Sequence, residues 1–289
     1  MKVLAIVTSA RKVGNSEILA KEMLAALPDS VEKKLLRISD CRIEPCQACY
    51  ACLTSGKDCI IPDDLASILH EIQEADAIIL TSPIYFLGMH TRLKLLCDRL
   101  ISVLNEGEKY AGRRCVVAVP YGIEGWQGYG VEATVSVARF LHLNVVGVLP
   151  VHAANPGEAV QPEILNRARE LACRLLPKNA VALPAEPEGN SRQTTNAGDI
   201  ACSACGGGIF RIANTGEIQC VICGTSAKLK MPGTSADATV QCTGAMPDPF
   251  RYSTAGMTEH AQRLEAIKAE FIARRQELLA LRKPYRDEK

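Results

Sequence analysis

Apolar and polar residues alternate along the first 175 residues of the chain with two different periods. Short runs rich in β-branched residues predict five strands, at residues 3–8, 34–38, 77–82, 115–120 and 145–151. The stretches between them carry apolar residues at helical spacing and predict helices at residues 16–27, 63–74, 91–104, 131–141 and 162–176. The third and fourth strands are almost continuously apolar, which is typical of strands buried on both faces of a parallel sheet.

Strands that alternate with helices predict βαβ units, and therefore an α/β fold with a doubly wound, five-stranded parallel sheet. Five such strands fit the order 2-1-3-4-5, in which the loops at the carboxyl ends of the strands bind ligands. We assign residues 1–177 to this first domain.

The pattern changes after the first domain. Residues 178–200 are polar and contain prolines, which predicts a linker. Residues 201–232 are bounded by cysteines and predict a small metal-binding module, and residues 233–289 predict a polar stretch followed by an amphipathic helix from residue 258. Along that helix a narrow apolar stripe predicts packing against the body of the protein or a second subunit; it comprises Leu264, Ile267, Phe271, Leu278 and Leu281.

The composition is that of an ordinary globular protein, with 47% hydrophobic and 22% charged residues. The 33 basic and 32 acidic residues give a net charge of +1, so the overall charge does not favour nucleic acid or an anionic membrane. The apolar run at the N-terminus is shorter than that of a secretory signal. No segment approaches the ~18 apolar residues of a membrane helix. We therefore expect a cytoplasmic protein without nucleic-acid or membrane partners.

The loop after the first strand has the composition of an anion site. Residues 9–16 read Ser-Ala-Arg-Lys-Val-Gly-Asn-Ser and lead directly into a predicted helix. Backbone N–H groups at a helix N-terminus point toward a bound phosphate, and hydroxyl, amide and guanidinium groups add donors. The loop is neither a G-x-G-x-x-G nor a Walker motif. A polar loop in which Asn15 or Ser16 merely caps the helix is the alternative.

Two further strand ends carry loops against which a flat ring could stack. Residues 82–89 are apolar and aromatic, and residues 121–128 contain glycines and the single tryptophan. With the anion loop, these features resemble the NAD(P)H-dependent FMN reductase and flavodoxin-like superfamily over residues 1–175. The resemblance implies that the FMN phosphate is bound by Ser9, Arg11, Asn15 and Ser16. It also implies that the isoalloxazine ring is contacted by Pro83, Ile84, Tyr85 and Phe86, with Gly122 and Gly125 closing over it.

Thirteen cysteines are the unusual feature of the chain. Cytosolic thiols stay reduced, so clustered cysteines indicate metal or redox ligands rather than disulfides. Five of them lie within residues 41–62, and four of these five read Cys46-x2-Cys49-x2-Cys52-x6-Cys59. Four thiolates are what a [4Fe–4S] cluster requires.

This motif resembles that of the iron–sulfur flavoprotein family, flavodoxin-like proteins with a compact cysteine loop before the second helix. The resemblance implies a [4Fe–4S] cluster beside FMN, and a homo-oligomer (dimer or tetramer) in which cluster and flavin pair across subunits. Cys41 is a possible substitute ligand. A zinc site, or a set of thiols without a metal, is the alternative.

A second set of cysteines forms two knuckles, Cys202-x2-Cys205-Gly206 and Cys220-x2-Cys223-Gly224. Paired knuckles present four sulfurs tetrahedrally, and each glycine permits the tight turn behind a thiolate. A zinc ribbon is favoured, and a rubredoxin-like single iron is the alternative.

These features predict an FMN-dependent oxidoreductase that passes electrons from ferredoxin or NAD(P)H through the cluster and FMN to a small-molecule acceptor. The rivals are a cluster-free NAD(P)H-dependent FMN or quinone reductase, and a non-enzymatic redox carrier or sensor that docks through the ribbon. No catalytic residue is assigned. Tyr85 and His90 are candidates, and capping of a helix is the alternative role for His90.

Overall fold

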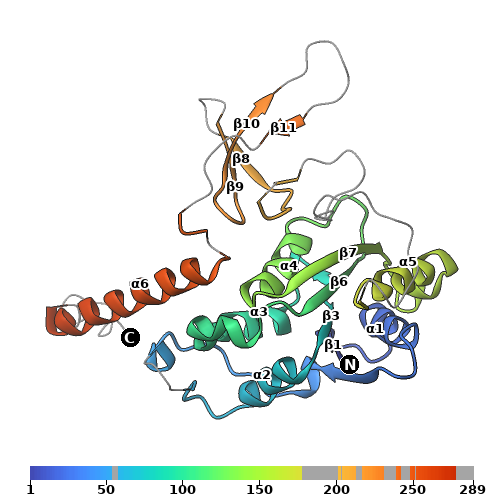
Figure 1. The fold of residues 1–289 in the computed structure, drawn as a ribbon, viewed down its shortest axis with the longest axis horizontal. Coiled ribbons are helices and arrows are strands. Elements are labelled where there is room, and N and C mark those ends of the chain that lie inside the picture. Colours follow the sequence, from blue (N-terminus) through green and yellow to red (C-terminus); the bar gives the residue numbers. More distant parts are fainter. Residues whose placement is uncertain are drawn as a thin grey trace, which may run out of the picture.

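A five-stranded parallel sheet forms the centre of the molecule in a computed structural model of the chain (Figure 1). The structure describes residues 1–53, 58–177, 201–202, 204–212, 217–230, 239–241, 248–250 and 252–277. The strands are β1 (Lys2–Val7), β2 (Glu32–Arg37), β3 (Ala77–Thr81), β6 (Arg114–Tyr121) and β7 (Asn144–His152). They pair in the order β2-β1-β3-β6-β7, all parallel, which confirms the predicted order 2-1-3-4-5.

Helices cover both faces of the sheet, and the pleat of the strands assigns alternate residues to two cores. Helices α1 (Asn15–Ala25) and α5 (Pro162–Cys173) cover one face, whereas α2 (Leu65–Glu74), α3 (Thr91–Arg99) and α4 (Gly130–Phe140) cover the other. In β3, Ile78 and Leu80 belong to the core under α2–α4, while Ile79 belongs to the core under α1 and α5. Burial on both faces explains why this strand is continuously apolar.

One predicted helix ends earlier than its apolar pattern does. The helix predicted over 91–104 is α-helical only to Arg99 and continues as the 3₁₀ segment η3 (Leu100–Lys109), whose backbone leaves helical geometry at Val103. Both kinds of helix bring residues three apart onto one face, so the spacing of Leu100 and Val103 does not distinguish them.

Shorter elements lie in the loops. The hairpin of β4 (Ile84–Tyr85) and β5 (Gly88–Met89) follows β3, and 3₁₀ turns occur at η1 (Ile38–Asp40), η2 (Ala51–Leu53) and η4 (Glu158–Val160). The hairpin did not emerge from the sequence pattern because two-residue strands have no measurable period.

The C-terminal region begins with a small antiparallel sheet. It contains β8 (Phe210–Ile212), β9 (Glu217–Cys220), β10 (Ser226–Lys230) and β11 (Thr239–Gln241), in the order β11-β10-β9-β8. The sheet thus includes a strand beyond residue 232, where the metal module was predicted to end. The predicted linker at 178–200 lies outside the described residues, as does Cys242.

The terminal helix α6 (Thr254–Ala273) starts four residues before the predicted position. Ser253 caps it, because its Oγ accepts a hydrogen bond from the Gly256 N–H at 3.0 Å. Met257 and Ala261 are buried against Leu53 and Leu104 of the first domain.

Of the predicted apolar stripe, Leu264 packs against this same cluster, whereas Ile267 and Phe271 are about half exposed; Leu278 and Leu281 lie outside the described residues. Among the described residues, no helix combines the length and apolar character needed to cross a membrane.

Candidate functional site

A cavity of about 470 Å³ opens at the carboxyl edge of the central sheet. Loops after β1, β3, β6 and β7 line it, so segments from the whole first domain meet there. Nine of the ten predicted flavin contacts are among its lining residues: Ser9, Arg11, Asn15, Ser16, Pro83, Ile84, Tyr85, Phe86 and Gly122. Gly125 is not, and lies at the open end of its loop with a left-handed φ of 76°.

One end of the cavity has unused hydrogen-bond capacity. Ser16, in the first turn of α1, is 2% exposed, and its Oγ has no hydrogen-bond partner among the described residues. A buried hydroxyl without a partner is costly, so such groups usually meet a ligand or a water. Arg11 lines the same end and forms no ion pair with a described carboxylate. An anion at the α1 N-terminus would meet a guanidinium, a hydroxyl and backbone N–H groups.

Asn15 lines the cavity, but its side chain forms its hydrogen bonds with the segment after β7. Its two amide hydrogens go to the carbonyls of Ala153 and Asn155, at 3.0 and 2.9 Å. Its Oδ1 accepts the N–H groups of Gly157 and Ala159. Its amide therefore ties the loop after β7 to the loop after β1, and its backbone N–H is the group left for an anion.

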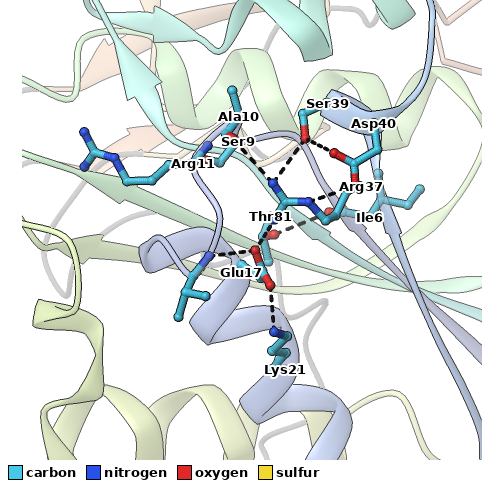
Figure 2. A network of polar contacts seen from close by, with 11 residues as sticks. Ile6, Ser9, Ala10, Arg11, Glu17, Lys21, Arg37, Ser39, Asp40 and Thr81 are labelled. Carbon is cyan, nitrogen blue, oxygen red and sulfur yellow. Dashed lines mark hydrogen bonds and ion pairs between the residues drawn. The ribbon is translucent and has the colours of Figure 1, made fainter.

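A polar network centred on the buried Glu17 carboxylate contacts the anion loop (Figure 2). The Glu17 carboxylate accepts the Val13 N–H at 2.9 Å, the Lys21 ammonium at 2.7 Å and the Arg37 guanidinium. Arg37 also reaches the carbonyl of Ala10. The Arg11 side chain points away from this network in Figure 2, which leaves its charge available to the cavity.

The network sets the ionisation of Glu17. Burial by itself raises the pKa of this carboxyl, but hydrogen bonds from Lys21 and Val13, and the charge of Arg37, outweigh it and hold the pKa below its ordinary value. Arg37 was not identified from the sequence. Its position at the carboxyl end of β2, beside the β1 loop, was the available signal.

The opposite end of the cavity is apolar and aromatic. Tyr85 and Phe86 of the β4–β5 hairpin are 55% and 98% exposed, and Trp126 is 62% exposed. Phe86 and Leu87 both have positive φ, of 49° and 64°, which is the pattern of a type I′ turn. That turn favours Asn and Gly, so bulky side chains here carry strain, a feature that clusters at functional sites.

The segment after β6 fixes this hairpin from the side. The Tyr129 N–H donates to the Leu87 carbonyl at 2.9 Å, and a Cβ at Gly128 would collide with Leu87. Five further lining residues lie in the three loops that the sequence pointed to, without having been named as contacts: Gly14, Leu87, Tyr121, Ile123 and Trp126. Sequence reasoning missed Pro120, Ala153 and Ala154, which end or follow strands whose carboxyl ends meet here.

His90 lies behind the hairpin rather than among the residues that line the cavity. Its Nδ1 accepts the Arg92 N–H at 3.1 Å and caps α3, and its ring packs against Tyr85 at a centroid distance of 5.3 Å. Burial, and then the charge of Arg92, lower the pKa of the imidazole. This geometry matches the capping alternative.

The first cysteine set lies between η1 and α2, at the edge of the core under α2–α4. Cys46, Cys52 and Cys59 are partly buried and Cys49 is exposed. Within the described ranges, these four Sγ atoms do not gather to within 4.8 Å of one another, whereas a second cysteine group does. Four cysteines in one loop are the donor set that a multi-iron cluster needs, because each thiolate binds a different iron. Cys41 donates its thiol to the Arg37 carbonyl at 3.5 Å.

The four cysteines of the second set lie close enough together to bind one metal ion. Cys202, Cys205, Cys220 and Cys223 are buried, with all Sγ atoms within 4.8 Å of one another. Two of the Sγ–Sγ distances are 3.7 and 3.6 Å. A tetrahedron with metal–sulfur bonds of about 2.3 Å has edges of about 3.8 Å, so these sulfurs fit one ion rather than a cluster.

The turns behind these thiolates have the expected glycines. Gly206 and Gly224 have φ of 68° and 80°, the left-handed conformation that glycine adopts without strain. The Gly207 N–H points to the Cys205 Sγ at 3.4 Å. Such a hydrogen bond orients a ligand toward its metal.

Comparisons with known proteins agree with this geometry. The family model of NADPH-dependent FMN reductases matches residues 1–156. An iron–sulfur flavoprotein of Archaeoglobus fulgidus is 31% identical over 183 residues, which cover 61% of this chain and 79% of that protein. An iron–sulfur flavoprotein of Methanocaldococcus jannaschii is 42% identical over 100 residues, which cover 34% of this chain and 51% of that relative, or about half its length.

Among solved structures, a flavone reductase superposes with a TM-score of 0.70 at 16% identity, covering 100% of this chain and 98% of that one. At this identity the likeness shows the fold alone. The family is shown by the family model and by the Archaeoglobus fulgidus relative. The chain therefore belongs to the NADPH-dependent FMN reductase family and, within it, to the iron–sulfur flavoproteins, and it is an FMN-dependent oxidoreductase.

Proposed function

We propose that the protein passes electrons between a donor, a [4Fe–4S] cluster held by Cys46, Cys49, Cys52 and Cys59, and FMN in the cavity, and so reduces a small-molecule acceptor. The donor is ferredoxin or NAD(P)H. One observation carries the proposal: the cavity has anion-binding groups at one end and aromatic walls at the other. A molecule with a phosphate at one end and a flat aromatic ring at the other would fit both ends of the cavity.

At the polar end, Ser16 donates its hydroxyl to the phosphate, Arg11 supplies charge, and the Asn15 N–H lies at the start of α1, whereas the Gly14 N–H already donates to the Arg11 carbonyl at 3.4 Å. Ser9 keeps its hydroxyl hydrogen free, because its Oγ accepts the Arg11 N–H at 3.2 Å. When bound, the flavin accepts one or two electrons, whereas an iron–sulfur cluster handles one at a time.

At the apolar end, Ile84, Tyr85 and Trp126 form the walls against which the ring stacks, and they exclude water from one side of it. Phe86, at the tip of the hairpin, is almost fully exposed. This exposure supports a homo-oligomer in which a second copy covers the tip of the hairpin. We place the protein in the cytoplasm, where its cysteines stay reduced.

The ribbon cysteines hold one metal ion, which we propose is zinc. Four thiolates at tetrahedral spacing support zinc, and the same spacing admits a single iron. Zinc has no redox chemistry, so this site is structural, whereas iron would add a third redox centre.

Metal and flavin analysis of anaerobically purified protein tests the proposal. We expect about four irons, one zinc and one FMN per chain, with broad visible absorbance that bleaches with dithionite. FMN without iron would favour the cluster-free reductase. About five irons without zinc would make the ribbon rubredoxin-like. A loaded protein that reduces no acceptor, among flavins, quinones and ferricyanide, would favour a carrier or sensor.

A cysteine variant tests whether the two redox sites are separate. Cys49→Ser is expected to abolish the cluster, because it removes one of four ligands, and to retain FMN. Cys173→Ser, at the end of α5, is the matched control and should keep both. Loss of iron and FMN together in Cys49→Ser would contradict separable sites.

A further inference from the structure

Arg99, the last residue of α3, is 1% exposed. A buried guanidinium normally needs a full set of partners. It lies 40 residues from Cys59 in the sequence, yet its Nη2 donates to the Cys59 Sγ at 3.3 Å. Burial and this contact make Arg99 a charged group beside a proposed cluster ligand.

The remaining bonds hold the guanidinium rigidly in place. Nη1 donates to the Glu44 carbonyl at 2.7 Å and to Asp63 at 2.5 Å, and Nη2 donates to the other Asp63 oxygen at 3.2 Å. The Asp63 side chain is fully buried. It also accepts the N–H groups of Glu44 and Leu65, so it joins both ends of the cysteine loop to α2 and α3. The planar guanidinium binds the Asp63 carboxylate through both Nη atoms, and one of them, Nη2, also donates to the Cys59 sulfur.

One donor of Arg99 is left over. Its Nε is buried and has no hydrogen-bond partner within the described residues. A buried N–H without a partner costs free energy. Arg99 therefore donates one hydrogen bond to the Cys59 sulfur through Nη2 and keeps a second donor, Nε, without a partner among the residues that the structure describes.

We propose that Arg99 is a positioning residue that holds Cys59 and raises the reduction potential of the iron–sulfur group. This inference rests on the proposed function. Reduction adds one electron, supplied by the donor, with no bond formed or broken and no proton moved, since arginine stays protonated. The added negative charge is shared with the sulfurs, so a hydrogen bond and a positive charge at Cys59 favour the reduced state.

Two variants with opposite expected signs test the proposal. Arg99→Lys keeps the charge for Asp63 but loses the fork that reaches Cys59 at the same time. At a fixed solution potential, the ratio of reduced to oxidised cluster should fall about tenfold, a shift of about 59 mV for one electron. Asp63→Asn leaves the Arg99 charge uncompensated, so the potential should rise.

The control is Arg113→Lys. Arg113 donates to the carbonyls of Gln73, Ala75 and Lys109, and no contact with a cysteine is found for it in the described structure. It should leave the potential unchanged. Potentials come from an anaerobic dithionite titration followed by electron paramagnetic resonance, with iron, FMN and circular dichroism measured on each sample.

The outcomes separate this inference from the proposed function. A wild type without iron at the cysteine loop would overturn the proposed function, and this inference with it. A wild type with a cluster, and an Arg99→Lys variant with the same potential, would overturn the role of Arg99 alone. Shifts of the same sign in Arg99→Lys and Asp63→Asn would also overturn it, since loosening of the loop would act alike in both. If Arg99→Lys retains no iron, the sign of Asp63→Asn decides.

Discussion

Ser16 buries a hydroxyl at the polar end of the cavity without giving it a partner among the described residues. Such a group destabilises the protein unless something binds to it, whereas a bound phosphate turns it into a strong donor. The Ser16 hydroxyl is thus expected to destabilise the flavin-free protein and to strengthen the binding of FMN.

We predict that Ser16→Ala raises the Kd for FMN by about 10-fold to 100-fold, because a hydrogen bond to a charged acceptor contributes about 1.5–3 kcal/mol. The stability of the flavin-free protein should stay equal or rise slightly, since a buried orphan hydroxyl is removed. FMN fluorescence titration and urea unfolding measure the two effects. Ser136→Ala on α4 is the control, because that hydroxyl bonds the Ala133 carbonyl away from the cavity. A less stable apoprotein with unchanged affinity would show that the hydroxyl is structural.

Glu17 holds a strained part of the anion loop. Val13 has a φ of 53°, which is unfavourable for a β-branched residue, and its N–H is fixed by the Glu17 carboxylate. Glu17→Gln should lower the free energy of unfolding by about 2 kcal/mol and weaken FMN binding. Urea unfolding measures the first effect, and Glu170→Gln on the exposed side of α5 is the control. An unchanged stability would refute the supporting role of Glu17.

The same carboxylate predicts a pH dependence. Because the pKa of Glu17 is lower in the folded protein, its contribution is complete above the ordinary value of 4.5 and is lost as the pH falls below it. The difference in stability between wild type and Glu17→Gln should therefore shrink as the pH falls below about 4.5. Parallel unfolding curves of both proteins, from pH 7 to well below the ordinary pKa of the carboxyl, check this. A constant difference would contradict it.

At the scale of elements, α6 is joined to the cysteine loop from the far end of the chain. The Lys268 ammonium donates to the Tyr50 carbonyl at 3.0 Å, between Cys49 and Cys52. Tyr50 and Ala48 have φ of 54° and 49°, so the loop needs external support to keep this shape. We infer that α6 stabilises the loop by packing over η2 and η3.

Truncation of Met257 tests the docking of α6. Met257 is 4% exposed, so Met257→Ala should cost about 2–5 kcal/mol of the docking energy of the helix. Hydrogen exchange should rise in α6 and in residues 46–53, while β1 and β3 stay protected. Gln262→Ala, on the exposed side of α6, is the control. Unchanged exchange in the cysteine loop would contradict support by α6.

In the whole molecule, two small hydrophobic clusters are linked to each other. The ribbon cysteines pack with Phe250 and Tyr252, and Tyr252 also packs in the cluster of Met257 and Leu53. The metal module, α6 and the cysteine loop are therefore in contact through one tyrosine. The flavin cavity is built by other loops.

Removal of the ribbon metal tests this organisation. A small sheet around four thiols takes much of its stability from its ion. Cys220→Ser should lose one metal per chain and its protection in β8–β9, yet keep FMN; metal analysis, hydrogen exchange and flavin absorbance measure this. The control is Ser226→Ala in β10, which retains all four cysteines. Concurrent loss of FMN would show that the ribbon supports the cavity.

Much of the fold follows from the sequence because it depends on neighbouring residues. The five strands lie within about two residues of their predicted ends, since their apolar runs are local. The gathering of the four ribbon cysteines was predictable because each knuckle brings its own glycine. The cavity residues were predictable because parallel strands end at one edge of the sheet.

Other features depend on residues far apart in the chain. No local sequence pattern predicts which distant residues pair, as in the contacts of Glu17 with Arg37, Arg99 with Cys59, and Lys268 with Tyr50. The β4–β5 hairpin and the role of Asn15 as a tie between loops are of the same kind.

The alternation of strands and helices and the two cysteine sets can be read from the sequence, because period and spacing are properties of contiguous residues. The strand order followed from the fold class that this alternation predicts. Three features came from packing alone: the donor that remains unpaired in the cavity, the charge that reaches Cys59, and the helix that covers the cysteine loop. The physical reason is that burial and hydrogen bonding between distant segments exist only after the chain has packed.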